Sequence, residues 1–170
     1  LMRWPEISAV SFVGSTPAAR AIYSVSSASG KRVQALGGAK NHAIVLPDAD
    51  LEMASNAIMG AAYGSCGQRC MALSVVVTVG RETSDQLANT LANKVARLTI
   101  GPGRQNLDMG PVNSAVQLDK ILALVESGVS EGADLLVDGR LNNCCHQPGY
   151  FLGGCLFDNV KTGMRIYQEE

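Results

Sequence analysis

The sequence predicts an α/β fold. Short apolar runs that suit buried strands alternate with longer stretches whose apolar residues recur every three or four positions, as they do along one helical face. Alternation of strands and helices is typical of the α/β class. With 170 residues, of which 46% are hydrophobic, the chain is long enough to bury a core.

The N-terminal residues predict a strand, a helix and a second strand. An apolar run covers residues 7–13, and helical periodicity follows over residues 18–29. Ser15 or Thr16 can cap this helix, because a hydroxyl there satisfies a free amide of its first turn. A second apolar run at residues 33–36 ends the unit.

Two adjacent glycines, Gly37 and Gly38, mark the predicted joint between two folding units. Glycine lets the backbone turn sharply, and the composition shifts slightly at this point. We therefore expect one domain at residues 1–38 and a second at residues 39–170.

The second unit is expected to alternate in the same way. Asp50 is a suitable N-cap for a helix whose apolar face runs through residues 51–62. The other predicted elements are strands at 43–46, 74–79 and 135–137, helices at 87–98 and 118–129, and an extended segment at 150–157.

Composition excludes several classes of protein. The net charge is -1 and no basic block is present, so nucleic acid is not an expected partner. No apolar run approaches the roughly 20 residues that span a bilayer, and the N-terminus has no signal-peptide core. We therefore expect no membrane partner and a cytoplasmic location.

The cysteines and histidines do not predict a metal site. Five cysteines in a chain of this size favour free thiols in a reducing compartment over a disulfide framework. Cys144-Cys145 could bind metal or oxidise, although an incidental loop pair is the favoured interpretation. No Cys/His group has zinc-ligand spacing, and His42 is more simply a hydrogen-bonded structural residue.

Cys70 is the candidate nucleophile. It follows a glycine and two polar residues at the end of a predicted helix, where a thiol can be exposed and activated. Arg69 supplies a neighbouring cation, and the backbone N–H of such a turn can stabilise an oxyanion. A buried core thiol is the alternative for Cys70. Cys66 would share a helical face with Cys70 if the helix continued, and a packing role is favoured for it.

The turn at Gly14-Ser15-Thr16 is a second candidate site. It lies between a predicted strand and a predicted helix, where amide groups and a hydroxyl can hold a phosphate. The full glycine fingerprint of dinucleotide binding is absent, because Ala18 and Ala19 occupy the next positions. A plain N-cap explains the same residues.

Taken in order, four motifs resemble the aldehyde dehydrogenase superfamily. They are Ser11-Phe12-Val13-Gly14-Ser15-Thr16, Leu36-Gly37-Gly38-Ala39-Lys40, Pro47-Asp48-Ala49-Asp50-Leu51 and Gly67-Gln68-Arg69-Cys70. The resemblance covers the whole chain, which looks like an internal segment of such an enzyme. Within the superfamily the chain is most similar to the acylating, coenzyme A-dependent methylmalonate-semialdehyde dehydrogenase branch. Residues 30–35, 39–42 and 67–74 carry that finer likeness.

This resemblance implies a fold and an activity. The fold would be an incomplete aldehyde dehydrogenase catalytic domain, preceded by the last strand–helix–strand piece of a Rossmann-like NAD-binding domain. The reaction would be NAD-dependent oxidation of methylmalonate or malonate semialdehyde to an acyl-coenzyme A through a cysteine thioester. The whole enzyme would be a homo-oligomer, a dimer or tetramer. A hydrolytic aldehyde dehydrogenase of other specificity and a non-catalytic truncated module are the alternatives.

The resemblance also implies roles for individual residues. Cys70 matches the nucleophile, and its amide N–H matches one oxyanion donor. Gly14 and Ser15 match the turn that borders the NAD pyrophosphate and nicotinamide, and Glu170 matches the acidic residue that holds the nicotinamide ribose. Arg69 matches a position that contacts the substrate carboxylate, for which a guanidinium is well shaped.

Leu36 departs from the hydrolytic members of the superfamily. Those members carry a glutamate that activates water, and alignment on Lys40 places Leu36 at its position. Leucine cannot accept a proton, so we expect deacylation by water to be slow and a thiol to be the acceptor. The acylating branch usually has an asparagine–methionine pair here, so Leu36-Gly37 differs from that branch too.

Overall fold

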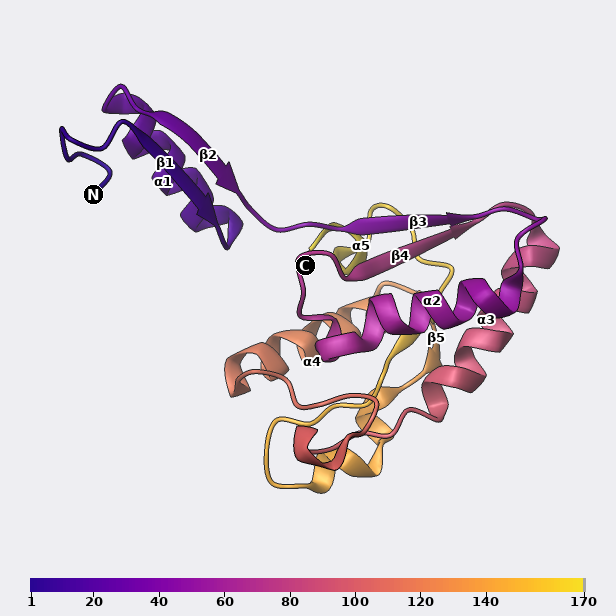
Figure 1. Ribbon diagram of the computed structural model, residues 1–170. Coiled ribbons are helices and arrows are strands. Elements are labelled where there is room, and N and C mark those ends of the chain that lie inside the picture. Colours follow the sequence, from indigo (N-terminus) through magenta and orange to yellow (C-terminus); the bar gives the residue numbers. More distant parts are fainter. Residues whose placement is uncertain (170) are drawn as a thin grey trace. The chain divides into compact units, whose positions relative to one another are not determined.

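The computed structural model describes residues 1–169 and divides into two compact units (Figure 1). The first unit is Leu1–Ala39, and the second begins at Lys40. This division lies one residue beyond the predicted joint between residues 38 and 39.

The first unit is a parallel strand–helix–strand. Strand β1 (Ala9–Val13) pairs with β2 (Arg32–Leu36), and helix α1 (Thr16–Ala28) connects them. Ser15 occupies the predicted N-cap position, but its side chain makes no capping hydrogen bond to the helix. The predicted order of elements is confirmed.

The second unit follows the predicted alternation of strands and helices. Strand β3 (Asn41–Val45) and β4 (Leu73–Thr78) are parallel, and β5 (Asp134–Val137) and β6 (Leu156–Asp158) are antiparallel. The α-helices of this unit are α2 (Leu51–Tyr63), α3 (Arg81–Ala96), α4 (Ala115–Ser130) and α5 (Arg165–Gln168). Short 3-10 turns cover Gly64–Gly67 (η1), Gly103–Gln105 (η2), Gly139–Leu141 (η3) and Asn143–His146 (η4). Of the predicted extended segment 150–157, only the last two residues belong to a strand.

Helix α2 is positioned by a side-chain cap and an apolar face. The Asp50 carboxylate accepts a hydrogen bond from the Met53 N–H at 3.0 Å, as predicted for an N-cap. Buried Val45, Ile58 and Leu87 join strand β3 to helices α2 and α3 in one core cluster. Burying such side chains stabilises the unit by roughly 1.5–3 kcal/mol each.

A second apolar cluster lies beyond the C-terminal end of α2. Its buried members are Ile100, Met109, Cys144 and Phe151. The chain that leaves α2 packs against this cluster through Cys66, which is partly buried.

Two classes of feature are not found among the residues that the structure describes. No helix within residues 1–169 is long and apolar enough to cross a membrane. Within the same residues, no group of three or more His, Cys, Asp and Glu side chains is arranged to hold a metal ion.

Candidate functional site

The chain reverses direction between helix α2 and the turn that carries Cys70. Three consecutive residues after the helix, Ser65, Cys66 and Gly67, have φ angles of 53°, 55° and 69°. This left-handed backbone is open to glycine but costs other residues roughly 1–2 kcal/mol each. Strained residues of this kind concentrate at functional sites, so the turn that follows, which carries Cys70, is a candidate site.

Cys70 lies in a tight turn that leads into β4. The Ala72 N–H donates to the Arg69 carbonyl oxygen at 2.9 Å and closes the turn. Cys70 is exposed, and the neighbouring Met71 is 83% exposed. Among residues 1–169, none makes a hydrogen bond with the Cys70 sulfur or its amide N–H. Neither the thiol nor the N–H of this exposed residue is therefore committed to a hydrogen bond among the described residues.

The two residues before Cys70 anchor this turn to the rest of the unit. The Gln68 side-chain oxygen accepts from the Asn113 N–H at 3.1 Å. The Arg69 Nη2 donates to the carbonyl oxygens of Gly60 at 2.7 Å and Ala61 at 2.9 Å. These carbonyls belong to the last turn of α2, where a cation is favourable. Arg69 therefore has a structural role whether or not it also binds a substrate.

Asn41, the first residue of β3, also holds the turn. Its Nδ2 donates to the carbonyl oxygen of Cys70 at 3.0 Å and to that of Ala72 at 2.8 Å. The amino-acid pattern did not predict this contact, because 29 residues separate Asn41 from Cys70. Its place within residues 39–42, which carry the likeness to the methylmalonate-semialdehyde dehydrogenase branch, was the one available signal.

Cys66 does not share a face with Cys70, because α2 ends at Tyr63 and the helix does not continue. The Cys66 thiol donates to the Gly110 carbonyl oxygen at 2.9 Å. Burial raises the pKa of this thiol above its ordinary value. The favoured packing role of Cys66 agrees with this geometry.

Of the other three cysteines, Cys145 and Cys155 contact the backbone of Gly139, and Cys144 is buried in the second apolar cluster. The Cys145 thiol donates to the Gly139 carbonyl oxygen at 3.5 Å, and the Cys155 sulfur accepts from the Gly139 N–H at 3.3 Å. Cys144 is buried, and its burial together with the nearby Cys145 raises its pKa to about 12. Burial also raises the pKa of Cys155. A thiol with a raised pKa stays protonated near neutral pH, and the protonated form is a poor nucleophile.

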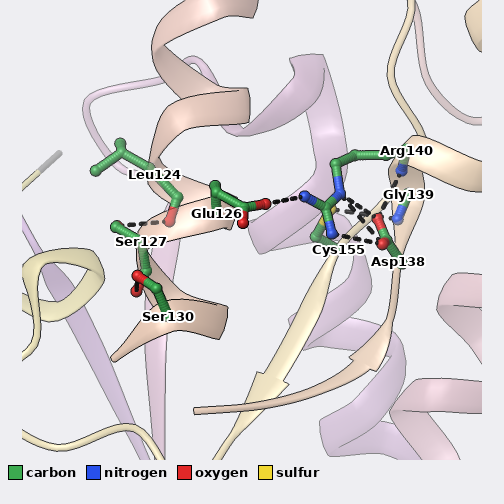
Figure 2. Close-up of polar contacts among 8 residues, drawn as sticks. All are labelled: Leu124, Glu126, Ser127, Ser130, Asp138, Gly139, Arg140 and Cys155. Atoms are coloured by element: carbon green, nitrogen blue, oxygen red, sulfur yellow. Dashed lines mark hydrogen bonds and ion pairs between the residues drawn. The ribbon is translucent and has the colours of Figure 1, made fainter. Parts of the chain in front are cut away.

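An ion-pair network supports the Gly139 backbone. Figure 2 shows Arg140 between Asp138 and Glu126, next to Gly139. The Arg140 guanidinium contacts the Asp138 carboxylate with Nε at 2.9 Å and Nη2 at 2.7 Å, and Nη1 lies 2.8 Å from Glu126. These hydrogen bonds hold the pKa of Asp138 below its usual value. The network is a structural tie between α4 and the end of β5.

His42 is a hydrogen-bonded structural residue in the geometry of the site. Its Nδ1 lies 2.7 Å from the Lys40 carbonyl oxygen, and its Nε2 lies 3.0 Å from the Tyr167 hydroxyl. A carbonyl oxygen can only accept, so Nδ1 carries a proton, and in the neutral ring Nε2 accepts from Tyr167. Both ring nitrogens are therefore engaged.

The predicted cofactor residues lie in the first unit and at the C-terminus. The Gly14 N–H donates to the Leu36 carbonyl oxygen at 3.1 Å, and Ser15 stands at the N-terminus of α1. The Thr16 hydroxyl accepts from the Gly38 N–H at 3.0 Å. Glu170 lies outside the described residues.

Comparison with known proteins identifies the family of the chain. The model of the aldehyde dehydrogenase family matches residues 1–170. The chain belongs to the aldehyde dehydrogenase family. The identification made from the four sequence motifs, and the aldehyde dehydrogenase fold that it implied, are confirmed.

Individual members of the family give a finer likeness. The chain is 54% identical over 172 residues to a malonate-semialdehyde dehydrogenase of Pseudomonas aeruginosa, and the match covers all of this chain and 35% of that protein. It therefore spans about a third of the length of the curated relatives that it matches.

Solved structures from the family superpose closely on the chain. The methylmalonate-semialdehyde dehydrogenase from Oceanimonas doudoroffii has a TM-score of 0.94 at 47% identity, and the match covers 99% of this chain and 35% of that one. A 1-pyrroline-5-carboxylate dehydrogenase from Thermus, solved with bound NAD, has a TM-score of 0.89 at 30% identity, and the match covers 100% of this chain and 33% of that one.

Proposed function

We propose that the protein oxidises a short carboxylated aldehyde, methylmalonate or malonate semialdehyde, with NAD and transfers the acyl group to coenzyme A. The observation that carries the proposal is the environment of Cys70. Of the five cysteines it is the exposed one, and its thiol and amide N–H make no hydrogen bond within residues 1–169. The names of the similar semialdehyde dehydrogenases support the choice of substrate.

The residues of the turn can perform the covalent steps. The Cys70 thiolate adds to the aldehyde carbon, a C–S bond forms, and the carbonyl oxygen becomes an oxyanion to which the Cys70 N–H can donate. When bound, NAD supplies the acceptor for the hydride on the same carbon. The acyl group then remains on Cys70 as a thioester, and attack by a second thiol releases the Cys70 thiolate.

Features of the first unit suit a dinucleotide. Helix α1 has 13 residues, and its N-terminus carries Ser15, whose hydroxyl makes no hydrogen bond to the helix. Amide groups and the dipole at such an N-terminus favour phosphate oxygens. Gly14 and Ser15 would hold the pyrophosphate side of NAD, and Glu170 would hold its ribose.

Coenzyme A is proposed as the acyl acceptor because of Leu36. This residue ends β2 and stands in sequence where hydrolytic relatives are expected to carry their base. A thiol is a strong enough nucleophile to attack a thioester without such help, whereas water is not. We extend the proposal to a reducing compartment such as the cytoplasm, in keeping with five free thiols, and to a homo-oligomeric parent enzyme.

Arg69 is proposed to contact the substrate carboxylate in addition to its contacts with α2. Its Nη2 is engaged by two carbonyl oxygens of the helix, and a guanidinium carries five N–H donors in all. The remaining donors can form hydrogen bonds with a carboxylate next to Cys70.

The test is to trap the acyl group. The full-length enzyme is mixed with NAD and malonate semialdehyde without coenzyme A, quenched in acid and digested. We expect mass spectrometry to find the acyl mass on the peptide that contains Cys70, and coenzyme A to remove it. Equal loss of the acyl group in water alone would contradict the acylating reaction, and an unmodified Cys70 would contradict the proposed nucleophile.

A further inference from the structure

We propose that Asn41 is a positioning residue for Cys70. The inference rests on the proposed role of Cys70 as the nucleophile. Asn41 donates both hydrogen bonds that reach the backbone carbonyls of the turn at Cys70 and Ala72.

The side chain of Asn41 uses its full donor capacity on the turn. A primary amide has two N–H groups, and the Nδ2 of Asn41 lies 3.0 Å from one carbonyl oxygen and 2.8 Å from the other. Two bonds from one nitrogen fix the distance between these carbonyls. They therefore fix the peptide planes on the C-terminal side of Cys70 and of Ala72.

The backbone ladder of the sheet does not hold this part of the chain. Pairing of β3 with β4 begins with Asn41 opposite Leu73, and the register shifts before His42 pairs with Val75. Cys70 precedes Leu73 and lies outside the strand. The Asn41 side chain thus extends the pairing beyond the end of the ladder, to the residue that carries the thiol.

The other anchors of the turn act on different residues. Gln68 is held by Asn113, and Arg69 is held by the end of α2. Among the described residues, Asn41 supplies the one side-chain hydrogen bond to Cys70 itself. The Cys70 N–H and sulfur make no hydrogen bond within the described residues. The hydrogen bond from Asn41 to the Cys70 carbonyl oxygen therefore orients the residue without engaging its thiol or its N–H.

The expected consequence is a loss of rate without a loss of fold. A displacement of about 1 Å at a reacting group can slow a reaction by roughly 100-fold. We expect Asn41→Ala and Asn41→Asp to lower kcat by roughly 10- to 100-fold in the full-length enzyme, with the KM for NAD unchanged. Asn41→Asp keeps the shape of the side chain but removes both donors.

The matched control is Asn93 on α3. Its Nδ2 also donates to a backbone carbonyl, that of Asn89 at 3.0 Å, and it is exposed. Asn93→Ala and Asn93→Asp should leave kcat within about twofold of the parent enzyme, because a surface substitution of this kind has small effects. Asn41→Ser, which keeps one short donor, should fall between Asn41→Ala and the parent.

A second readout does not need turnover. The rate of Cys70 alkylation by iodoacetamide is measured from about pH 6 to about pH 10, a range that spans the usual thiol pKa, and the melting temperature is recorded for every variant. We expect the pH profile for Cys70 to change in the Asn41 variants and to stay the same in the Asn93 variants. A folded Asn41→Ala or Asn41→Asp enzyme with parental kcat and a parental profile would overturn the proposal. If both variants unfold, Asn41→Ser decides by the same two criteria.

The two proposals fail in different ways. If Cys70 carries no acyl group during turnover, the proposed function fails, while the alkylation profile still measures whether Asn41 orients the thiol. If the acyl group forms on Cys70 but Asn41 variants react at the parental rate, the positioning role alone is wrong.

Discussion

Two groups of cysteines in the second unit lie in opposite surroundings. Cys70 is exposed on a turn, and the turn is held by its backbone carbonyls and by the side chains next to the thiol. Cys145 and Cys155 bond to the Gly139 backbone through their sulfurs, and Cys144 is buried in the second apolar cluster. Burial raises the pKa of Cys144 and Cys155. The difference shows that cysteine has two roles in this unit. Near Gly139 the cysteines pack in the interior, whereas Cys70 is left open to ligands.

The largest expected effect comes from removing the exposed thiol. Cys70→Ser should lower kcat by at least about four orders of magnitude, because a hydroxyl is a far weaker nucleophile than a thiolate and no base lies beside it in sequence. Steady-state NADH formation by the full-length enzyme measures this loss. Cys66→Ser is the matched control, since a serine hydroxyl can keep the hydrogen bond to Gly110. A comparable loss in both variants would end the distinction between reactive and structural cysteines.

A smaller effect is expected from the structural side of the comparison. An alanine Cβ at Gly139 would lie 2.0 Å from the Gly153 carbonyl oxygen, so backbone must move. We expect Gly139→Ala to lower the free energy of unfolding by about 3 kcal/mol, with kcat per folded molecule little changed. Denaturant titration measures the loss. Gly163→Ala is the control, because its Cβ would meet no atom within 4 Å. Parental stability in the Gly139→Ala enzyme would show that the close backbone contact does not hold this region.

The smallest expected effect concerns Arg69, which has both a structural and a proposed substrate role. Arg69→Ala should lower the free energy of unfolding by about 1 kcal/mol, because the carbonyls at the end of α2 lose their donor. It should also raise the KM for carboxylated aldehydes more than that for neutral ones. Thermal melting and steady-state kinetics with both kinds of aldehyde measure the two effects.

Arg69→Lys separates these two roles. A lysine can still donate to helix carbonyls but lacks the guanidinium fork. We therefore expect thermal melting to recover in Arg69→Lys while the KM for carboxylated aldehydes stays high. Equal KM changes for carboxylated and neutral substrates would leave Arg69 as a helix cap only.

Local sequence pattern predicted the elements of this fold well. Helical periodicity and the Asp50 cap located α2, and apolar runs located β1 to β4 within about two residues. Those signals are local, because a cap acts within one turn and an amphipathic face repeats every three or four residues. The motif around Cys70 likewise indicated a thiol that can be exposed, with a buried thiol as the alternative, and the structure has it exposed.

The remainder depended on contacts between distant residues. The left-handed backbone at Ser65 and Cys66 contradicts the local preference of both residue types, so no sign of it was present in the sequence. Arg69 was predicted to face a substrate, but its choice of the α2 carbonyls depends on how the chain folds back. These backbone angles and hydrogen-bond partners are determined by tertiary packing, so no periodic pattern in the sequence predicts them.

The contact between Asn41 and the turn has a consequence for the chemical ageing of the protein. Asparagine is among the thermolabile residues, and hydrolysis of its side-chain amide leaves a carboxylate that accepts hydrogen bonds but donates none. At Asn41 this change would place a negative charge against two carbonyl oxygens that it now binds. On the proposed positioning role of Asn41, a stored enzyme would then lose activity as this one amide is hydrolysed, while its apolar core stayed that of fresh protein.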